Sequence, residues 1–195
     1  MTDIATTHRK TPAALRALLA GLVDYAGLFP PAKLSMAEAV AEYARHRSSP
    51  ERWMLGRFVV TAARLDDLAD ALLALPAATR GLPWAVSALA LPPDVPGDAR
   101  RIAEFNDQAG TLALVDAVET KASSPDEVDA ALTELRGLDL AEVYVELPHA
   151  VDRAALDALL ARVKAGGARA KVRTGGVTAD AFPTAEQVAT FILAC

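Results

Sequence analysis

The sequence predicts an α/β protein of serial strand–helix units whose parallel strands are arranged as in a TIM barrel. Short apolar runs alternate with amphipathic Ala- and Leu-rich stretches, and they start 27 to 34 residues apart, near Val23, Arg57, Trp84, Leu112, Glu142 and Arg169. No Gly-x-Gly-x-x-Gly turn follows the first run. Polar and apolar side chains alternate in the later runs, which favours a barrel with a polar interior over the alternative, an open doubly wound sheet covered on both faces.

A predicted helix follows each predicted strand. These helices are expected at residues 35–46, 63–75, 98–109, 124–135, 152–165 and 184–194. Ser124, Pro125 and Glu127 stand in the order of an N-terminal cap, and the pair Gly166-Gly167 stands where a left-handed C-cap belongs. Residues 11–22 are predicted to form an extra helix that covers the bottom of the barrel. No linker divides the chain, so residues 1–195 are interpreted as one domain.

The number of units raises a question, because six are readable and a closed TIM barrel has eight. The sequence therefore predicts a barrel-like domain that lacks the last two units. Such a sheet has two unpaired edges. We expect either that the chain is a truncated version of a longer barrel or that it closes by association with a second copy, so a homo-oligomer is predicted.

Composition excludes several classes of protein. The 195 residues include one cysteine, Cys195, and three scattered histidines, which excludes a multi-cysteine metal site and gives no metal-ligand spacing. The net charge is −5 without a basic block, so nucleic acid is not an expected partner. No stretch has the length of a membrane span, and the N-terminal residues lack the order of a secretory signal. We expect a cytoplasmic protein without a metal or cofactor.

Two residues near the carboxyl ends of the predicted strands are candidates for catalysis, Lys171 and Glu146. Lys171 faces the predicted interior, where its free amine could attack a carbonyl carbon. The alternative is a lysine that is ion-paired to Glu146 of the neighbouring strand. Glu146 could act as a general acid and base, or it could neutralise Lys171 or Arg173.

Seven residues are predicted to bind substrate. Arg173 precedes Thr174, Gly175 and Gly176, a pattern that indicates an anion clamp or only a tight turn. Glu119 and Lys121 share one face of their strand and extend the charged cluster, unless the strand has already ended and both are solvated. The same alternation places Asp116 on the opposite face. Asp24 begins a Pro-rich loop at the rim, which could instead be hydrophobic packing.

Two segments carry a resemblance to known families. The strands Glu142-Val-Tyr-Val-Glu146 and Lys171-Val-Arg-Thr-Gly175 resemble strands five and six of 2-deoxyribose-5-phosphate aldolase and its class I aldolase relatives. The resemblance implies that Lys171 is a Schiff-base lysine. Residues 24–32, Asp-Tyr-Ala-Gly-Leu-Phe-Pro-Pro-Ala, and residues 171–176, Lys-Val-Arg-Thr-Gly-Gly, also resemble uncharacterised bacterial TIM-barrel-like proteins that are longer. The second resemblance supports truncation and implies no activity.

Three hypotheses of function follow. The first is an aldolase-like enzyme that forms an imine between Lys171 and a small carbonyl substrate, which could carry a phosphate. The second is an isomerase or lyase on the same fold in which Glu146 and Lys171 act as a non-covalent acid and base and Arg173 holds an anion. The third is a non-catalytic barrel fragment whose edges serve assembly or partner binding. The fold alone does not decide among them.

Overall fold

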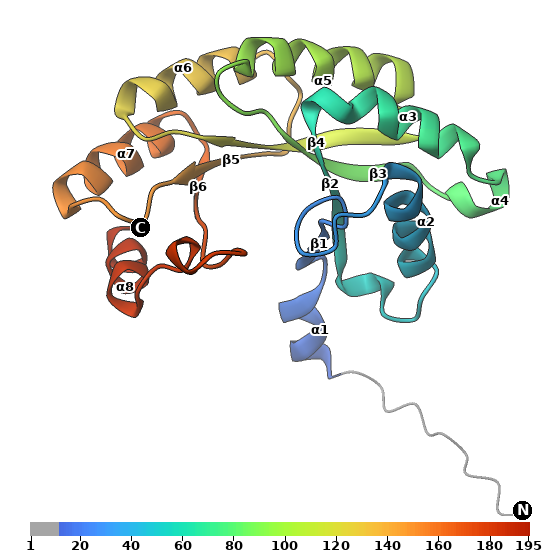
Figure 1. Ribbon diagram of the computed structural model, residues 1–195, viewed down its shortest axis with the longest axis horizontal. Coiled ribbons are helices and arrows are strands. Elements are labelled where there is room, and N and C mark those ends of the chain that lie inside the picture. The colour runs from blue at the N-terminus through green and yellow to red at the C-terminus, as the bar shows by residue number, and fades with distance from the viewer. Residues whose placement is uncertain (1–11) are drawn as a thin grey trace, which may run out of the picture.

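The computed structural model describes residues 12–195, except for the side chains of residues 78, 80 and 180. Six parallel strands follow one another in sequence order across a single sheet. They are β1 (Val23–Tyr25), β2 (Leu55–Thr61), β3 (Trp84–Leu89), β4 (Ala113–Lys121), β5 (Glu142–Leu147) and β6 (Arg169–Val172). The sheet curls into an open half-barrel (Figure 1). The predicted α/β fold with six βα units is confirmed.

Helices cover the convex side of the curled sheet (Figure 1). The α-helices of the described chain are α1 (Ala13–Leu19), α2 (Met36–Arg47), α3 (Leu65–Ala74), α4 (Ala77–Arg80), α5 (Val95–Ala109), α6 (Pro125–Leu135), α7 (Arg153–Ala165) and α8 (Ala185–Ala194). Three 3-10 turns are η1 (Arg52–Met54), η2 (Ala62–Arg64) and η3 (Ala179–Ala181). Within residues 12–195, no helix has both the length and the apolar character needed to cross a membrane.

Side-chain caps set the starts of the helices. Ser35 and Thr184 each form a capping box with the third residue of the following helix. The hydroxyl of Ser124 accepts a hydrogen bond from the backbone N–H of Glu127, as the predicted cap requires. Gly167 has a φ of 73° just after α7, which confirms the left-handed C-cap. Local sequence signals therefore fix where these helices begin and end.

The hydrophobic core lies between the convex face of the sheet and the helices. Alternate residues of each strand point into it, and the largest fully buried side chains include Trp84, Phe58, Leu65, Leu68 and Ile102. A second buried cluster under α6, α7 and α8 contains Val145, Leu159 and Phe191. Because one face of every strand is committed to this core, the other face is left to line the concave side.

The extra N-terminal helix is present but does not cover the sheet. It forms α1 over Ala13–Leu19, and Thr11 of the predicted range lies outside the described residues. None of its residues is buried, and Leu18 is 70% exposed. The prediction that this helix covers the bottom of the barrel is therefore wrong for the described chain, in which α1 projects from the amino-terminal side of β1 (Figure 1).

A β-bulge in β4 overturns the predicted position of Asp116. Val86 of β3 pairs with Val115, but the next residue, Ser87, pairs with Ala117, so Asp116 is an extra residue on β4. The side chain of Asn106 on α5 bonds both the N–H and the C=O of Val115, at 2.8 and 3.0 Å. Strict alternation is broken at this point, and Asp116 joins Glu119 on the concave face.

Gly56 allows β1 to approach β2 closely. A Cβ at this position would overlap the carboxylate of Asp24, which accepts a hydrogen bond of 2.6 Å from the backbone N–H of Arg57. β1 has only three residues, and its register with β2 shifts between Val23 and Tyr25. The Asp24 bond is therefore an important part of what holds this short strand to the sheet.

Gly56→Ala is predicted to lower the free energy of unfolding by about 2 kcal/mol, because the added methyl group displaces the Asp24 carboxylate. Urea denaturation followed by circular dichroism measures the change. Gly137→Ala is the matched control, since no heavy atom lies within 4 Å of its added Cβ and its φ is not positive. Equal effects of the two substitutions would contradict the proposed contact.

Candidate functional site

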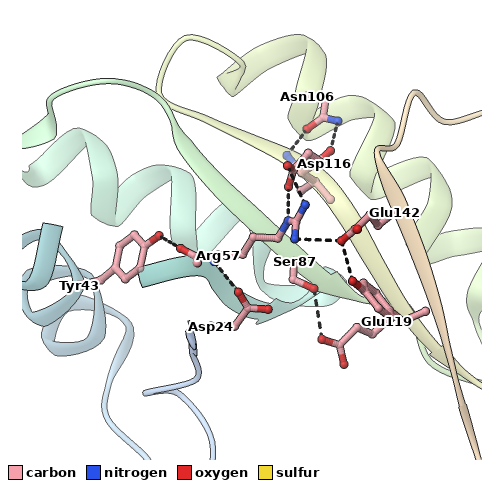
Figure 2. Close-up of polar contacts among 11 residues, drawn as sticks. Asp24, Tyr43, Arg57, Ser87, Asn106, Asp116, Glu119 and Glu142 are labelled. Atoms are coloured by element: carbon pink, nitrogen blue, oxygen red, sulfur yellow. Dashed lines mark hydrogen bonds and ion pairs between the residues drawn. The ribbon is translucent and has the colours of Figure 1, made fainter. Parts of the chain in front are cut away.

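The concave face of the half-barrel carries a continuous set of polar side chains from β1 to β6. Those that bond one another are Asp24, Arg57, Ser87, Asp116, Glu119, Lys121, Glu142, Tyr144, Glu146, Arg169, Lys171 and Arg173. Figure 2 shows several of them as they project from neighbouring strands. The contacts divide them into three groups, which we call the Arg57 network, the Lys171 pair and the Glu146 triad.

The Arg57 network joins β2, β4 and β5. The guanidinium of Arg57 donates to both carboxylate oxygens of Asp116, from Nε at 2.7 Å and from Nη2 at 3.2 Å. Its Nη1 donates to Glu142 at 3.3 Å (Figure 2). The hydrogen bond to Asp116 is the main cause that raises the pKa of Arg57. Because the planar guanidinium of Arg57 on β2 bonds one carboxylate on β4 and one on β5, it fixes the relative position of these three strands.

Glu142 is the most heavily bonded carboxylate of this network. Besides Arg57, it accepts a 2.6 Å hydrogen bond from the hydroxyl of Tyr144 and lies 2.9 Å from Nη2 of Arg169. The hydrogen bond from Tyr144 is the largest cause that lowers the pKa of Glu142, and Arg169 and Arg57 add to it. Every cation and carboxylate of the Arg57 network has a partner within the network.

Asp24 belongs to this network through the backbone of Arg57, and the charges of Glu119 and Lys171 also act on its carboxyl. Burial raises the pKa of Asp24, and the hydrogen bond from Arg57 opposes that effect. The loop that follows packs against α2, where the ring of Tyr25 contacts Tyr43 and Phe58. The structure thus gives Tyr25 a packing role, whereas the carboxylate of Asp24 is bonded to the backbone of β2.

The Lys171 pair connects β6 with β4. The ammonium group of Lys171 forms an ion pair with Oε2 of Glu119, whose other oxygen accepts a hydrogen bond of 3.4 Å from the hydroxyl of Ser87. The Glu119 side chain is 14% exposed, whereas that of Lys171 is 38% exposed. The carboxylate is therefore held between two elements, whereas part of the Lys171 side chain stays exposed. The expected alternative partner of Lys171, Glu146, is engaged elsewhere.

The Glu146 triad lies at the carboxyl ends of β4, β5 and β6. One carboxylate oxygen of Glu146 lies 3.1 Å from Nζ of Lys121 and 3.4 Å from Nε of Arg173, whose Nη2 donates to the other oxygen at 3.5 Å. Both cations are about half exposed and Glu146 is mostly buried. Lys121 is the last residue of β4, so the prediction that Glu119 and Lys121 extend the charged cluster is confirmed.

A cleft of about 760 Å³ opens beside the triad. Lys121, Glu146, Arg173 and His149 line it on the strand side, and the loop that begins with Pro92 and Pro93 lines it on the other. The structure therefore brings three of the predicted site residues to one cleft, at the end of the sheet where barrel enzymes place their sites. Lys171 is not part of the lining but is the register neighbour of Glu146 on β6.

Thr174, Gly175 and Gly176 follow β6 as predicted, but the glycines pack against protein. The ring of Phe182 lies 3.2 Å from the position of a Cβ on Gly175, and Cβ of Ala181 lies 2.5 Å from that on Gly176. Neither glycine has a positive φ. Close packing of this segment against Ala181 and Phe182 accounts for both glycines.

Sequence reasoning missed Arg57 and Ser87 as members of the concave face. Both stand at inward-facing positions of otherwise apolar strands, and the alternation argument that placed Glu146 and Lys171 applies to them equally. The bulge at Asp116 had no comparable signal, because the side chain that supports it, Asn106, comes from a helix.

The described residues contain no group of three histidine, cysteine, aspartate or glutamate side chains arranged to hold a metal ion. The chain matches no protein-family model, no curated protein and no solved structure. The resemblance to class I aldolases therefore stays a prediction from two strand motifs.

Tyr144→Phe is predicted to raise the pKa of Glu142 toward its ordinary value of 4.5. The lowered pKa stabilises the fold above pH 4.5 and this stabilisation is lost as the pH falls through the folded-state pKa. The free energy of unfolding of the variant should therefore be about 1 kcal/mol below that of the wild type at neutral pH. The difference should disappear at a pH below the folded-state pKa of Glu142. Carboxyl NMR titration of Glu142 measures the shift.

Tyr25→Phe is the control for this prediction, because its hydroxyl donates to Glu42 on α2 and not to Glu142. An unchanged Glu142 titration in Tyr144→Phe would show that the hydroxyl does not set the acidity of this carboxylate.

Proposed function

We propose that the protein is an aldolase-like enzyme that forms an imine between Lys171 and a small carbonyl substrate. The observation that carries the proposal is the Lys171 pair, a partly exposed lysine bound to one mostly buried carboxylate. Lysine has few structural reasons to face the interior of a barrel-like sheet. The resemblance of residues 171–175 to the Schiff-base strand of class I aldolases supports the same choice of residue.

Glu119 is suited to move the protons that imine formation requires. It accepts a proton from the Lys171 ammonium group, and the resulting neutral amine attacks the carbonyl carbon of the substrate. The attacking nitrogen then loses a proton, and the former carbonyl oxygen gains it, which gives the hydroxyl group of a carbinolamine. Protonated Glu119 then gives its proton to that hydroxyl, which leaves as water, and a protonated imine and the Glu119 carboxylate result. Ser87 holds the carboxylate in place through both transfers.

The Glu146 triad has a different part in this proposal. Glu146 was a candidate acid and base for Lys171, but its carboxylate is bound by Lys121 and Arg173. We assign it to positioning these two cations at the mouth of the cleft. The proton acceptor that contacts Lys171 is Glu119, which the sequence had placed among the substrate-binding residues.

A second candidate function is non-covalent acid and base catalysis on the same face. The ion pair itself favours it, because a lysine bound to a carboxylate can donate a proton to a substrate oxygen without forming a bond to carbon. This enzyme would be an isomerase or lyase with Lys171 as acid and Glu119 as base. It differs from the imine enzyme in one measurable respect, since borohydride has no adduct to reduce.

Borohydride trapping followed by intact-mass analysis tests the proposed function. The protein is incubated with a panel of small aldehydes and ketones, reduced, and digested to map the modified lysine. We expect one adduct, on Lys171, and a loss of about 100-fold in adduct formation for Lys171→Met and for Lys171→Arg, because a guanidinium does not form the imine.

Lys164→Arg is the control, since Lys164 lies in the last turn of α7 and outside the concave face. Labelling that is spread over surface lysines, or that persists in Lys171→Met, would contradict the imine mechanism. Turnover with a bell-shaped pH profile but without an adduct would favour the second candidate.

Association of copies, expected from the sequence, also remains a proposal. Within the described chain β1 and β6 each pair on one side only, and the side chain of Val23 on β1 is 55% exposed. Sedimentation velocity over a range of concentrations tests it. A single monomeric species at high concentration would contradict it.

A further inference from the structure

We infer that the substrate of this site carries an anionic group, a phosphate or a carboxylate, which binds to Lys121 and Arg173 while its carbonyl reaches Lys171. The inference rests on the proposed function for the position of the carbonyl. The anion site has its own support in the charges, exposure and location of the Glu146 triad.

The triad has an excess of positive charge directed at the cleft. Two cations share the single carboxylate of Glu146, so the triad has a formal charge of +1. Glu146 is 15% exposed, whereas Lys121 and Arg173 are 47% and 53% exposed. A guanidinium has five N–H donors, and those of Arg173 that Glu146 does not engage can bind a second acceptor. The strand side of the cleft, where these cations lie, is therefore cationic.

The remaining charges of the cleft favour one orientation of the ligand. Glu127 and Glu134 line the cleft from α6, and Glu127 accepts hydrogen bonds of 2.7 Å from both the N–H and the hydroxyl of Ser123. Negative charge is thus concentrated on the helix side and positive charge on the strand side. An anionic group is attracted to the strand side, next to β6.

The anion site lies within a few carbon atoms of the proposed imine. Lys171 and Arg173 are two residues apart along the chain at the end of β6, a spacing of about 7 Å in an extended strand. Glu146 is the register neighbour of Lys171, so the carboxylate that holds both cations stands beside the reactive lysine. A short substrate can therefore place its carbonyl at Lys171 and its anionic group at Arg173 together.

Three aldehydes distinguish the sources of negative charge: butanal is neutral, succinic semialdehyde carries a carboxylate, and glyceraldehyde 3-phosphate carries a phosphate. Borohydride trapping at Lys171 is compared at limiting concentrations. We expect the anionic aldehydes to label Lys171 about 10-fold more efficiently than butanal, and Arg173→Met to remove that preference. The order of the two anionic aldehydes identifies the preferred group.

Arg169→Met is the matched control. It removes a cation from the same strand, but Arg169 contacts Glu142 and not Glu146. The preference for anionic aldehydes should survive in this variant. A loss of preference equal to that of Arg173→Met would show that overall charge, and not the Glu146 triad, produces it, and would overturn the inference.

A separate measurement keeps the anion site distinguishable from the imine. Inorganic phosphate and propionate, which cannot form an imine, are titrated while the Arg173 side-chain Nε–H signal is followed by NMR. Saturable shifts of this signal that Lys121→Met abolishes would support the anion site, even if no aldehyde is trapped. Without a trapped aldehyde, the imine mechanism alone would be overturned. Equal trapping of all three aldehydes without such shifts would overturn the anion site and leave the imine.

Discussion

The guanidinium of Arg57 lies between the carboxylates of Asp116 and Glu142. The backbone N–H of the same residue donates a hydrogen bond to Asp24. Arg57 therefore connects β1, β2, β4 and β5 on the concave face. The helices commit the opposite face of each strand to the hydrophobic core. The concave face must therefore satisfy its own charged groups. Arg57 does so at the amino-terminal side of the sheet, and its contact with the bulged residue Asp116 stabilises the local geometry of β4 from which Glu119 and Lys121 extend.

The carboxyl-terminal side of the same face is organised differently. Its ion pairs join mostly buried carboxylates, Glu119 and Glu146, to cations that remain accessible. An enclosed ion pair needs further hydrogen bonds to offset the cost of desolvating both charges. Accessible cations on fixed carboxylates suit a site in which a ligand competes for the cation. The contrast between the enclosed guanidinium of Arg57, whose side chain is 22% exposed, and the more exposed side chains of Lys171 and Arg173 is the physical basis for placing function at the latter two residues.

Much of the fold was predictable because local signals and hydrophobic period agree along the chain. The six strands and the helices that follow them lie close to their predicted positions, since caps such as Ser35 and Ser124 and the regular repeat both specify them. The site was only partly predictable. Alternation placed Glu146 and Lys171 on one face, but the choice of partners depends on register, which the sequence does not reveal. Asp116 was misplaced because the bulge depends on Asn106 from another element.

The central claim is that Lys171 and Glu119 are paired for chemistry whereas the Arg57 network is there for structure. The free energy of unfolding of the double variant Lys171→Met, Glu119→Gln, compared with wild type by urea denaturation at neutral pH, tests this claim most directly. The variant removes both charges and keeps an acceptor for the buried hydroxyl of Ser87. Removing both charges of an ion pair that the fold does not need is neutral or stabilising, so we expect an equal or higher free energy of unfolding. A loss of more than about 2 kcal/mol would show that the pair is structural and would contradict the account.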